Sequence, residues 1–267
     1  MIPATFDYVR ASSVEDALEA LAVPDARLLA GGQSLLPAMK LRIARPSLLV
    51  DIGGLGLSGV EERDAALVIG ALTTWDELDR AEVLRRPAYR AVSECAARIG
   101  DLQVRNLGTI GGSLAHADPA ADMPAVLLAL AATVRARSTE GEREVPAGEL
   151  ATGPFTTTLG PAELITEVAL PIPPPGSGSA YVAVEHPASG FALAGAAALV
   201  GEDGSSRVAL TGVGATPFVL DGKLDAAEIY GDRFAPEEYR RGLARTVLAR
   251  AVALATKRAE EDSRWKT

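Results

Sequence analysis

Two glycine pairs, about eighty residues apart, constrain this chain more than any other feature. Gly31-Gly32 follows the apolar run 28–30, and Gly111-Gly112 follows Thr109-Ile110. Glycine permits positive φ and leaves no side chain between its N–H group and a ligand, so each pair predicts a tight turn. Small hydroxyl or amide residues flank both turns, which favours an extended polar ligand, such as a dinucleotide, held by main chain from two sides. For the first pair alone, a turn that binds nothing is an equal alternative, since Gly-Gly turns are common.

The first pair opens a segment suited to binding an anion. The amide N–H groups from Gly31 to Ser34 would point inward, and the Ser34 hydroxyl would add a donor. Backbone amides in such a nest bind phosphate oxygens without a basic side chain. Ser34 is also a candidate cap for a following helix, whose regularity Pro37 limits.

The second pair belongs to an apolar stretch with five polar residues: Thr109, Ser113, His116, Asp118 and Asp122. Asp118 is a candidate cap for a helix begun by Pro119. Asp122 precedes an apolar helix, where a buried carboxylate needs a donor such as a ribose hydroxyl or a flavin N–H. The alternative is that Asp122 simply occupies the first turn of that helix, where the helix dipole favours it.

The pattern around the pairs is not that of a Rossmann fold. Neither pair forms G-x-G-x-x-G, and no acidic residue follows at the expected spacing on a second strand. A dinucleotide would therefore be held on another fold.

Short strands and helices are expected to alternate without a regular βαβ rhythm. Strands are predicted at 27–30, 47–52, 67–72, 133–138 and 164–170, and helices at 12–21, 74–84, 87–99 and 123–130. Residues 12–15 match a capping box. Residues 171–179, with three consecutive prolines before glycine and serine, predict a domain boundary. Strands at 180–185, 191–200 and 207–213 and a helix from Pro236 to near Glu260 would form a small α+β domain.

Composition excludes several classes of function. The net charge of −9 disfavours a nucleic-acid partner. A single cysteine and two histidines exclude iron–sulfur and zinc clusters on ligand count, and no metal site is expected in this chain. The N-terminus lacks a signal-peptide pattern, and the apolar stretch 123–134 is too short to span a bilayer, so we expect a cytoplasmic protein without membrane insertion.

A few single residues invite a functional interpretation beside a structural one. His116 is a candidate general base, but no second histidine lies near it in the sequence. Cys95 lies in an alanine-rich helix, which favours a core position over a nucleophile. Arg105 and Asn106 fit a pocket, an interface or a surface turn. Four C-terminal arginines at helical spacing predict a solvated helix face: Arg240, Arg241, Arg245 and Arg250.

Taken together, AGGQSLLPAMKLR at 30–42 and TIGGSLAHADPAAD at 109–122 resemble the FAD-binding medium subunit of molybdenum hydroxylases. This family includes xanthine dehydrogenases and aerobic carbon monoxide dehydrogenases. Its pattern also matches IGALTTWDEL at 69–78, QVRNLGTIGGSL at 103–114 and SAYVAVEHPASGFALAGAAALV at 179–200, so the resemblance covers nearly the whole chain. It implies an α+β fold, with a two-lobed FAD-binding domain of the vanillyl-alcohol oxidase (PCMH) type at 1–175 and a small C-terminal α/β domain at 176–267.

The resemblance also implies a division of labour between chains. A large partner would carry the molybdenum cofactor, a small partner would carry two [2Fe–2S] clusters, and this chain would carry FAD, within a dimer of heterotrimers. Electrons would pass from the clusters through FAD to an external acceptor, so no side chain here is expected to be catalytic. The alternatives are a stand-alone flavin oxidoreductase and a degenerate subunit that binds partners without FAD.

Carried over by position, the family's cofactor contacts fall in four stretches of this sequence. They comprise the pyrophosphate side at 28–35, a pair near the flavin rings, the second glycine motif, and an apolar pair on the last strand before the linker. The residues are Leu28, Ala30, Gly31, Gly32, Gln33, Ser34, Leu35, Ile99, Gly100, Thr109, Gly111, Gly112, Ser113, His116, Asp118, Asp122, Leu164 and Ile165. Ala183 stands where many relatives carry a lysine, a departure that bears on acceptor chemistry rather than on FAD binding.

Overall fold

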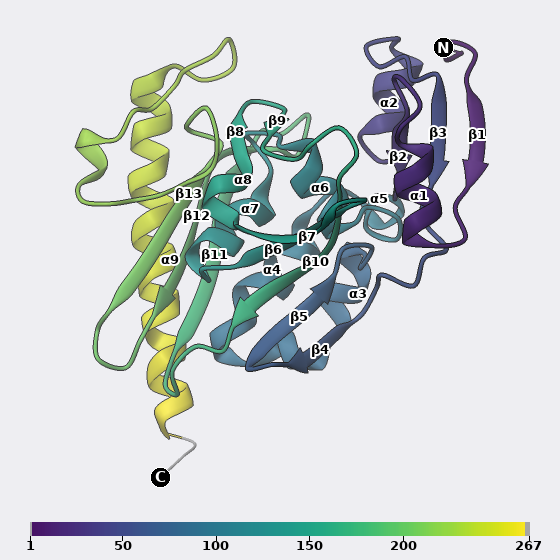
Figure 1. The fold of residues 1–267 in the computed structure, drawn as a ribbon. Helices are drawn as coiled ribbons and strands as arrows, with labels where there is room; N and C mark the ends of the chain where they lie inside the picture. Colours follow the sequence, from purple (N-terminus) through teal and green to yellow (C-terminus); the bar gives the residue numbers. More distant parts are fainter. Residues whose placement is uncertain (1, 265–267) are drawn as a thin grey trace.

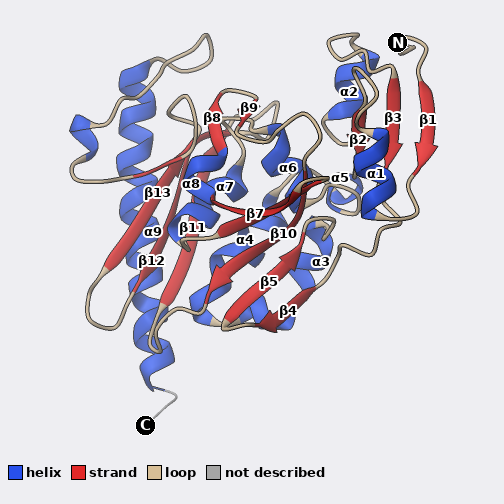
Figure 2. Ribbon diagram, viewed as in Figure 1, coloured by secondary structure: helices blue, strands red, loops and turns tan. Residues whose placement is uncertain are grey.

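A computed structural model describes residues 2–264, which form an N-terminal sheet, a central sheet and a C-terminal sheet with their covering helices (Figures 1 and 2). The central sheet lies between the other two, so the two ends of the chain lie at opposite sides of the molecule. None of the described helices is long and apolar enough to cross a membrane. The mixed α and β content is as predicted, whereas the PCMH type and the boundary at 175/176 stay predictions.

The N-terminal sheet is parallel, with its strands in the order β1-β3-β2. Its elements are β1 (Asp7–Arg10), α1 (Val14–Ala20), β2 (Arg27–Leu29), α2 (Leu35–Lys40) and β3 (Leu48–Asp51). Val50 and Leu18 pack in a buried cluster that also takes in Leu72 and Leu164 from outside this sheet. The N-terminal sheet therefore shares a core with the rest of the molecule, and the turn after β2 is held against it.

The central sheet is antiparallel, in the order β4-β5-β10-β6-β7. Its strands are β4 (Val60–Arg63), β5 (Ala66–Gly70), β6 (Thr133–Ser138), β7 (Gly141–Pro146) and β10 (Leu164–Pro171). The helices of this region are α3 (Trp75–Arg80), α4 (Arg90–Arg98), α5 (Leu102–Arg105), α6 (Ile110–His116), α7 (Asp122–Ala129) and α8 (Ala147–Leu150). Two 3₁₀ turns, Glu82–Arg85 and Pro87–Tyr89, join α3 to α4, and a small hairpin pairs β8 (Ala151–Gly153) with β9 (Thr156–Thr157).

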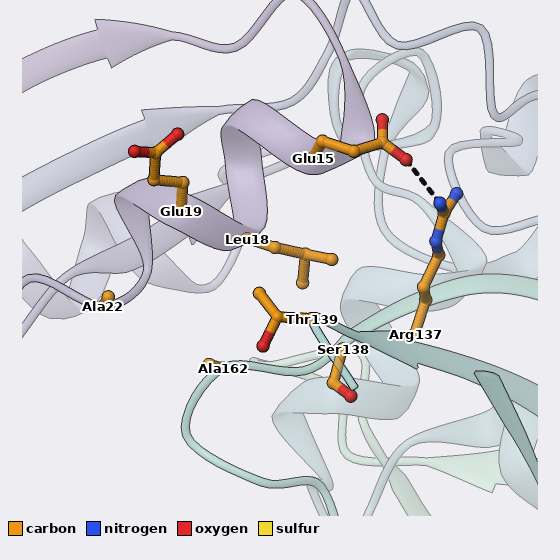
Figure 3. A pocket seen from close by; sticks show the side chains of 8 residues that line it. All are labelled: Glu15, Leu18, Glu19, Ala22, Arg137, Ser138, Thr139 and Ala162. Carbon is orange, nitrogen blue, oxygen red and sulfur yellow. Dashed lines mark hydrogen bonds and ion pairs between the residues drawn. The ribbon is translucent and has the colours of Figure 1, made fainter. Parts of the chain in front are cut away.

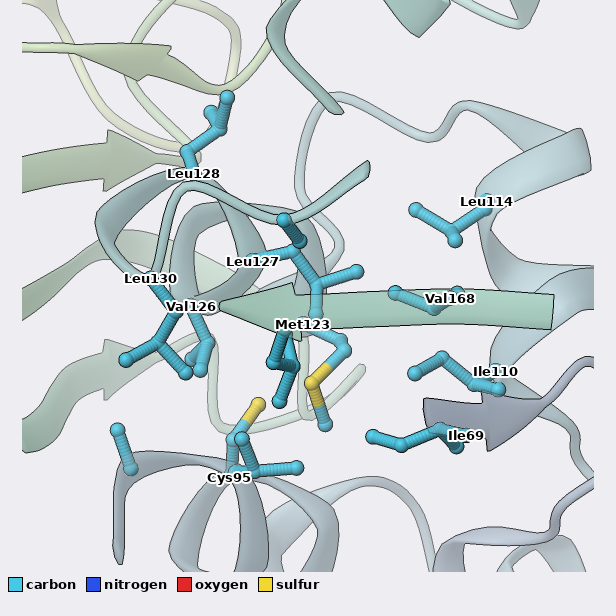
Figure 4. Packing of buried hydrophobic residues seen from close by; sticks show 14 of the residues in the cluster. Ile69, Cys95, Ile110, Leu114, Met123, Val126, Leu127, Leu128, Leu130 and Val168 are labelled. Carbon is cyan, nitrogen blue, oxygen red and sulfur yellow. The ribbon is translucent and has the colours of Figure 1, made fainter. Parts of the chain in front are cut away.

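The main core fills the space between the central sheet, α4, α6 and α7 (Figure 4). Ile69, Ile110, Met123 and Val168 meet there, and all four are fully buried. Cys95 is fully buried among them, as predicted, and burial raises the pKa of its thiol well above the usual range. A neutral, inaccessible thiol is inert, so Cys95 contributes packing rather than reactivity.

The C-terminal sheet is antiparallel, in the order β11-β12-β13-β14, and α9 (Glu237–Arg264) covers one of its faces. Its strands are β11 (Gly178–Glu185), β12 (Ala192–Val200), β13 (Ser206–Thr211) and β14 (Phe218–Val219), and a 3₁₀ turn lies at Leu224–Ala226. Small residues let the helix approach closely: a Cβ on Gly178 would lie 2.3 Å from the Ala255 carbonyl oxygen. The other side of β12 and β13 packs on α7, which joins this sheet to the central core.

Two local predictions outside the glycine motifs are wrong. The first helix is capped by Ser13 rather than Ser12, because the Ser13 hydroxyl accepts the Asp16 amide while Ser12 donates to the Asp16 carboxylate. Arg240 does not lie on a solvated face, because its side chain is 8% exposed. It donates to the carbonyl oxygens of Leu193 and Gly212 and pairs with Asp232, so it fixes loops around the start of α9.

Candidate cofactor site

The first glycine pair forms the turn between β2 and α2. Gly32 has φ of +69°, a left-handed conformation that strains any residue with a side chain. Its carbonyl oxygen accepts the Leu36 amide at 3.0 Å, which starts the helix. Ser34 holds the N-cap position, but its hydroxyl makes no capping hydrogen bond and the residue is exposed, so the predicted cap is absent while the hydroxyl stays available.

The amides of this turn are its most informative feature. Among the residues that the structure describes, no protein acceptor is bound by the N–H groups of residues 31–35. The Gln33 side chain braces the turn instead, by donating to the Gly31 carbonyl oxygen at 3.2 Å. Successive free N–H groups around a left-handed residue form a concavity for an anion. The turn therefore fits a phosphate oxygen.

The second glycine pair forms the first turn of α6, with Thr109 as the N-cap. The Thr109 hydroxyl accepts the Gly112 amide at 3.2 Å, and the Gly111 amide donates to the Ala71 carbonyl oxygen at 2.8 Å. The amides of Ile110 and Ser113 are also bound within the protein, to Thr73 and Thr109. The backbone of this turn is thus used for folding, in contrast to that of the first turn.

The structure brings the two turns together. A Cβ on Gly31 would lie 1.8 Å from the Leu107 carbonyl oxygen, so this glycine permits backbone contact with the segment before α6. A Cβ on Gly112 would lie 3.9 Å from the Ala30 Cβ and otherwise approach only the Thr109 hydroxyl. Gly112 is exposed, so the space in front of it is open between the turns.

The apolar candidates lie partly or wholly buried. Leu28 and Ala30 are half-buried against the N-terminal cluster, and Leu35 is half-buried as the first residue of α2. Leu164 and Ile165, at the start of β10, are 1% and 5% exposed. Their side chains are committed to the core, so this pair offers a ligand its backbone.

Ile99 and Gly100 end α4. Ile99 is the half-buried C-cap residue, and Gly100 is exposed with φ of +59°. Arg105, which the sequence left open between a pocket and a surface turn, donates to the Gly100 carbonyl oxygen at 2.8 Å. Arg105 therefore fixes the turn that leads towards α6.

His116 and Asp118 close the second motif. The His116 ring packs against the Phe155 ring at 5.1 Å between centroids, and Phe155 is exposed with φ of +56°. Asp118 does not cap a helix. Its carboxylate accepts the Ala120 amide at 2.9 Å within a tight turn, and α7 begins only at Asp122, because Ala121 takes an extended conformation.

Asp122 has a partner that the sequence did not indicate. It is half-buried at the start of α7, and its carboxylate accepts the hydroxyl of Tyr181 from β11. Desolvation raises the pKa of Asp122 to about 6, against the opposing effect of that hydrogen bond. Its position in the first turn of a helix fits the dipole alternative, and its burial fits the need for a donor, which Tyr181 meets in part.

Arg98 is a second residue that the sequence did not single out. Its guanidinium pairs with Glu185 at 2.7 Å and donates to the Ala183 carbonyl oxygen at 3.3 Å. A cation from α4 thus lies beside Ala183. In the sequence, the signal for the cluster of Asp122, Tyr181 and Arg98 is a tyrosine within the apolar strand 180–185.

A family described as the FAD binding domain in molybdopterin dehydrogenase matches residues 4–173. The chain belongs to this family. It is 45% identical to the 6-hydroxypseudooxynicotine dehydrogenase complex subunit alpha of Paenarthrobacter nicotinovorans, over 81% of this chain and 75% of that protein.

Matches to carbon monoxide dehydrogenases extend over nearly the full chain. The medium chain of Afipia carboxidovorans is 37% identical, over 97% of this chain and all of that one. The solved carbon monoxide dehydrogenase of Hydrogenophaga pseudoflava superposes with a TM-score of 0.91 at 34% identity, covering 97% of this chain and 99% of that one. The resemblance inferred from the glycine motifs is confirmed: the chain is an FAD-binding medium subunit of the molybdenum hydroxylase family and an oxidoreductase component.

A separate cavity of about 510 Å³ lies between α1 and the turn that joins β6 to β7 (Figure 3). Glu15 and Arg137, which form an ion pair, line it together with Leu18 and Ala22. None of its lining residues belongs to either glycine turn. The cavity is therefore distinct from the two glycine turns. The described residues also contain no cluster of histidine, cysteine and carboxylate side chains able to hold a metal.

Proposed function

We propose that this chain binds FAD across its two glycine turns and passes electrons from [2Fe–2S] clusters on a small partner chain to an external acceptor. The observation that carries the proposal is the run of free amides at residues 31–35 beside the open space at Gly112. The free amides suit an anionic group of the ligand, and the open space suits a flat, extended part of it.

Each part of the site has a distinct task in this proposal. The amides of 31–35 and the Ser34 hydroxyl bind the pyrophosphate, while Gly112 leaves room for the ligand to cross to α6. Asp122 accepts a ligand hydroxyl or N–H, and Ile99 with Gly100 borders the flavin rings. The bound FAD would supply the redox chemistry, and the protein supplies position, electrostatics and exclusion of water.

Partner chains and domain organisation extend the proposal. Relatives carry names such as "medium chain" and "complex subunit alpha", which supports assembly with a large molybdenum-cofactor chain and a small iron–sulfur chain. We propose a dimer of such heterotrimers, a PCMH-type FAD-binding domain at 1–175 and a C-terminal domain at 176–267. The proline-rich linker and the separate C-terminal sheet support this division.

The test is to express the chain with the coding sequences that neighbour it and to isolate the native complex. We expect flavin absorbance at one FAD per copy of this chain, together with two partner chains. A complex without flavin would contradict the proposal and favour a degenerate subunit. Turnover of an organic substrate by this chain alone would favour a stand-alone flavin oxidoreductase instead.

A further inference from the structure

Tyr181 is a buried polar residue, and a glycine on the neighbouring strand leaves room for its hydroxyl. It lies on β11, is 3% exposed, and donates its hydroxyl to Oδ1 of Asp122 on α7. Gly195 on the neighbouring β12 makes this possible, because a Cβ there would lie 2.4 Å from the tyrosine oxygen. A single glycine in an alanine-rich strand thus leaves room for one hydroxyl, which points to a specific use for that hydroxyl.

Besides the backbone amide of Asp122 itself, the Tyr181 hydroxyl is the neutral donor to this carboxylate, and the charged groups around it are engaged elsewhere. From α4, Cys95 and Arg98 face it, but Arg98 is held by Glu185 and by the Ala183 carbonyl oxygen. From β11, Tyr181 and Glu185 face it. β12 carries no charged residue, and Arg207 of β13 binds the Leu128 carbonyl oxygen at the far end of α7.

We propose that Tyr181 is a positioning residue for the cofactor. Its hydroxyl orients the Asp122 carboxylate and stabilises its ionised form as an acceptor for FAD. The inference rests on the proposed function and adds to it that the C-terminal sheet takes part in cofactor binding. An ionised carboxylate can accept several hydrogen bonds, so Oδ2 is left for a ligand once Tyr181 occupies Oδ1.

The inference predicts a defined pH dependence. Burial raises the pKa of Asp122 to about 6, and the Tyr181 hydrogen bond lowers it. FAD affinity should therefore decrease as pH falls through about 6, because the protonated acid loses acceptor capacity. Without the hydroxyl, the pKa of Asp122 rises further, so the midpoint of this decrease should move to higher pH.

The experiment uses Tyr181→Phe, which keeps the buried ring and removes only the hydroxyl. The full chain is stripped of flavin, and its affinity for added FAD is measured by fluorescence across the acidic and neutral range. We expect an affinity loss of about tenfold at neutral pH, with the midpoint shifted upwards. Tyr230→Phe is the matched control, because it removes a similar hydroxyl-to-carboxylate bond, to Glu228, at an exposed site. It should behave as the wild type.

Two results would overturn the inference. One is wild-type affinity and midpoint in folded Tyr181→Phe; the other is unchanged pH dependence in Asp122→Asn, which lacks the titrating carboxyl. The second variant decides the matter if Tyr181→Phe fails to fold. A wild-type chain that binds no FAD would instead contradict the proposed function, and the inference with it.

Discussion

At the first glycine turn the amides of residues 31–35 have no acceptor within the described part of the protein, whereas at the second turn every amide from Ile110 to Ser113 is bound by protein oxygens. The two turns share a glycine pair and small polar neighbours, yet only the first has main-chain donors to offer. The second turn is part of the framework, anchored to residues 71–73 and to its own cap. A ligand that touches both turns could therefore be bound by backbone amides at the first turn. At the second turn it would find open space and side chains, but no free amides.

Within each pair the two glycines also differ. Gly31 and Gly111 are packing positions, because a side chain at either would strike Leu107 or Ala71. Gly32 is needed for its left-handed backbone, and Gly112 for the open space in front of it. The effects of substituting each of the four glycines should therefore differ in experiment.

The largest effect is expected for Gly31→Ala. The added Cβ would lie 1.8 Å from the Leu107 carbonyl oxygen, and both sides of the contact are backbone, so the turns must move apart. We expect the free energy of unfolding to fall by about 3 kcal/mol, with loss of bound flavin. Urea unfolding and flavin content measure both. Wild-type stability would show that the two turns do not meet in this way.

Gly112→Val should separate flavin binding from folding. Its branched side chain fills the open space, while the framework loses only part of the Thr109 cap, whose hydroxyl would lie 2.8 Å from the new Cβ. We expect flavin content to drop more than about tenfold, at a stability cost of about 1 kcal/mol.

The control for this variant is Gly242→Val. Gly242 is also an exposed helical glycine, and nothing lies within 4 Å of a Cβ there. It should leave the flavin content unchanged. Equal flavin content in both variants would move the cofactor away from the second turn.

Much of the fold could be predicted because it depends on local patterns. The buried strands and the apolar helix α7 appear as continuous apolar runs, and the boundary region as a proline and glycine cluster. The adjacency of the glycine turns was an expectation from their shared character, and the contact between Gly31 and Leu107 now gives its geometry. The family assignment followed from the order and spacing of the same motifs, and it is confirmed.

What could not be predicted depends on residues distant in the sequence. The bond between Asp122 and Tyr181 joins positions 59 residues apart, and nothing local marks either as the partner of the other. The same holds for Arg240. Helical spacing predicted a solvated position for it, but its side chain donates to the carbonyl oxygens of distant loops. The Asp118 prediction failed for a local reason, since its carboxylate closes a tight turn before any helix begins.

Gly32→Ala tests the first turn at lower cost. Gly56 shares its φ of +69° but has nothing within 4 Å of a Cβ, so Gly56→Ala is a matched control. Both changes should cost about 1 kcal/mol through the left-handed backbone. Gly32→Ala should cost somewhat more, because its Cβ would lie 2.9 Å from Leu36 Cδ1. Only Gly32→Ala should also weaken FAD binding severalfold, because it alters the direction of the free amides. An equal FAD affinity in the two variants would contradict the anion site at this turn, and titration with FAD at matched temperature measures it.

The smallest effect concerns Asp122 and the pH dependence of the free energy of unfolding. The pKa of Asp122 is about 6 in the folded chain, above its ordinary value of 3.8, so the folded state binds more protons between these limits. The stabilisation that comes from this raised pKa is fully present below about pH 4. It is lost as pH rises through about 6. Carboxylates whose pKa is lowered, such as Asp51 and Glu163, act in the opposite direction, so the informative quantity is wild type minus Asp122→Asn.

That difference, measured by urea unfolding of the flavin-free chain, should change by about 1 kcal/mol across this range, less than the full shift implies because Asp122 keeps some exposure. The corresponding difference for Gly32→Ala should not vary with pH, since residues 31–34 carry no titrating side chain. A pH-independent difference for Asp122→Asn would mean that this carboxyl is solvated in the folded chain. The proposed difference between the first turn, which offers backbone amides, and Asp122, which offers a carboxylate, would then rest on geometry alone.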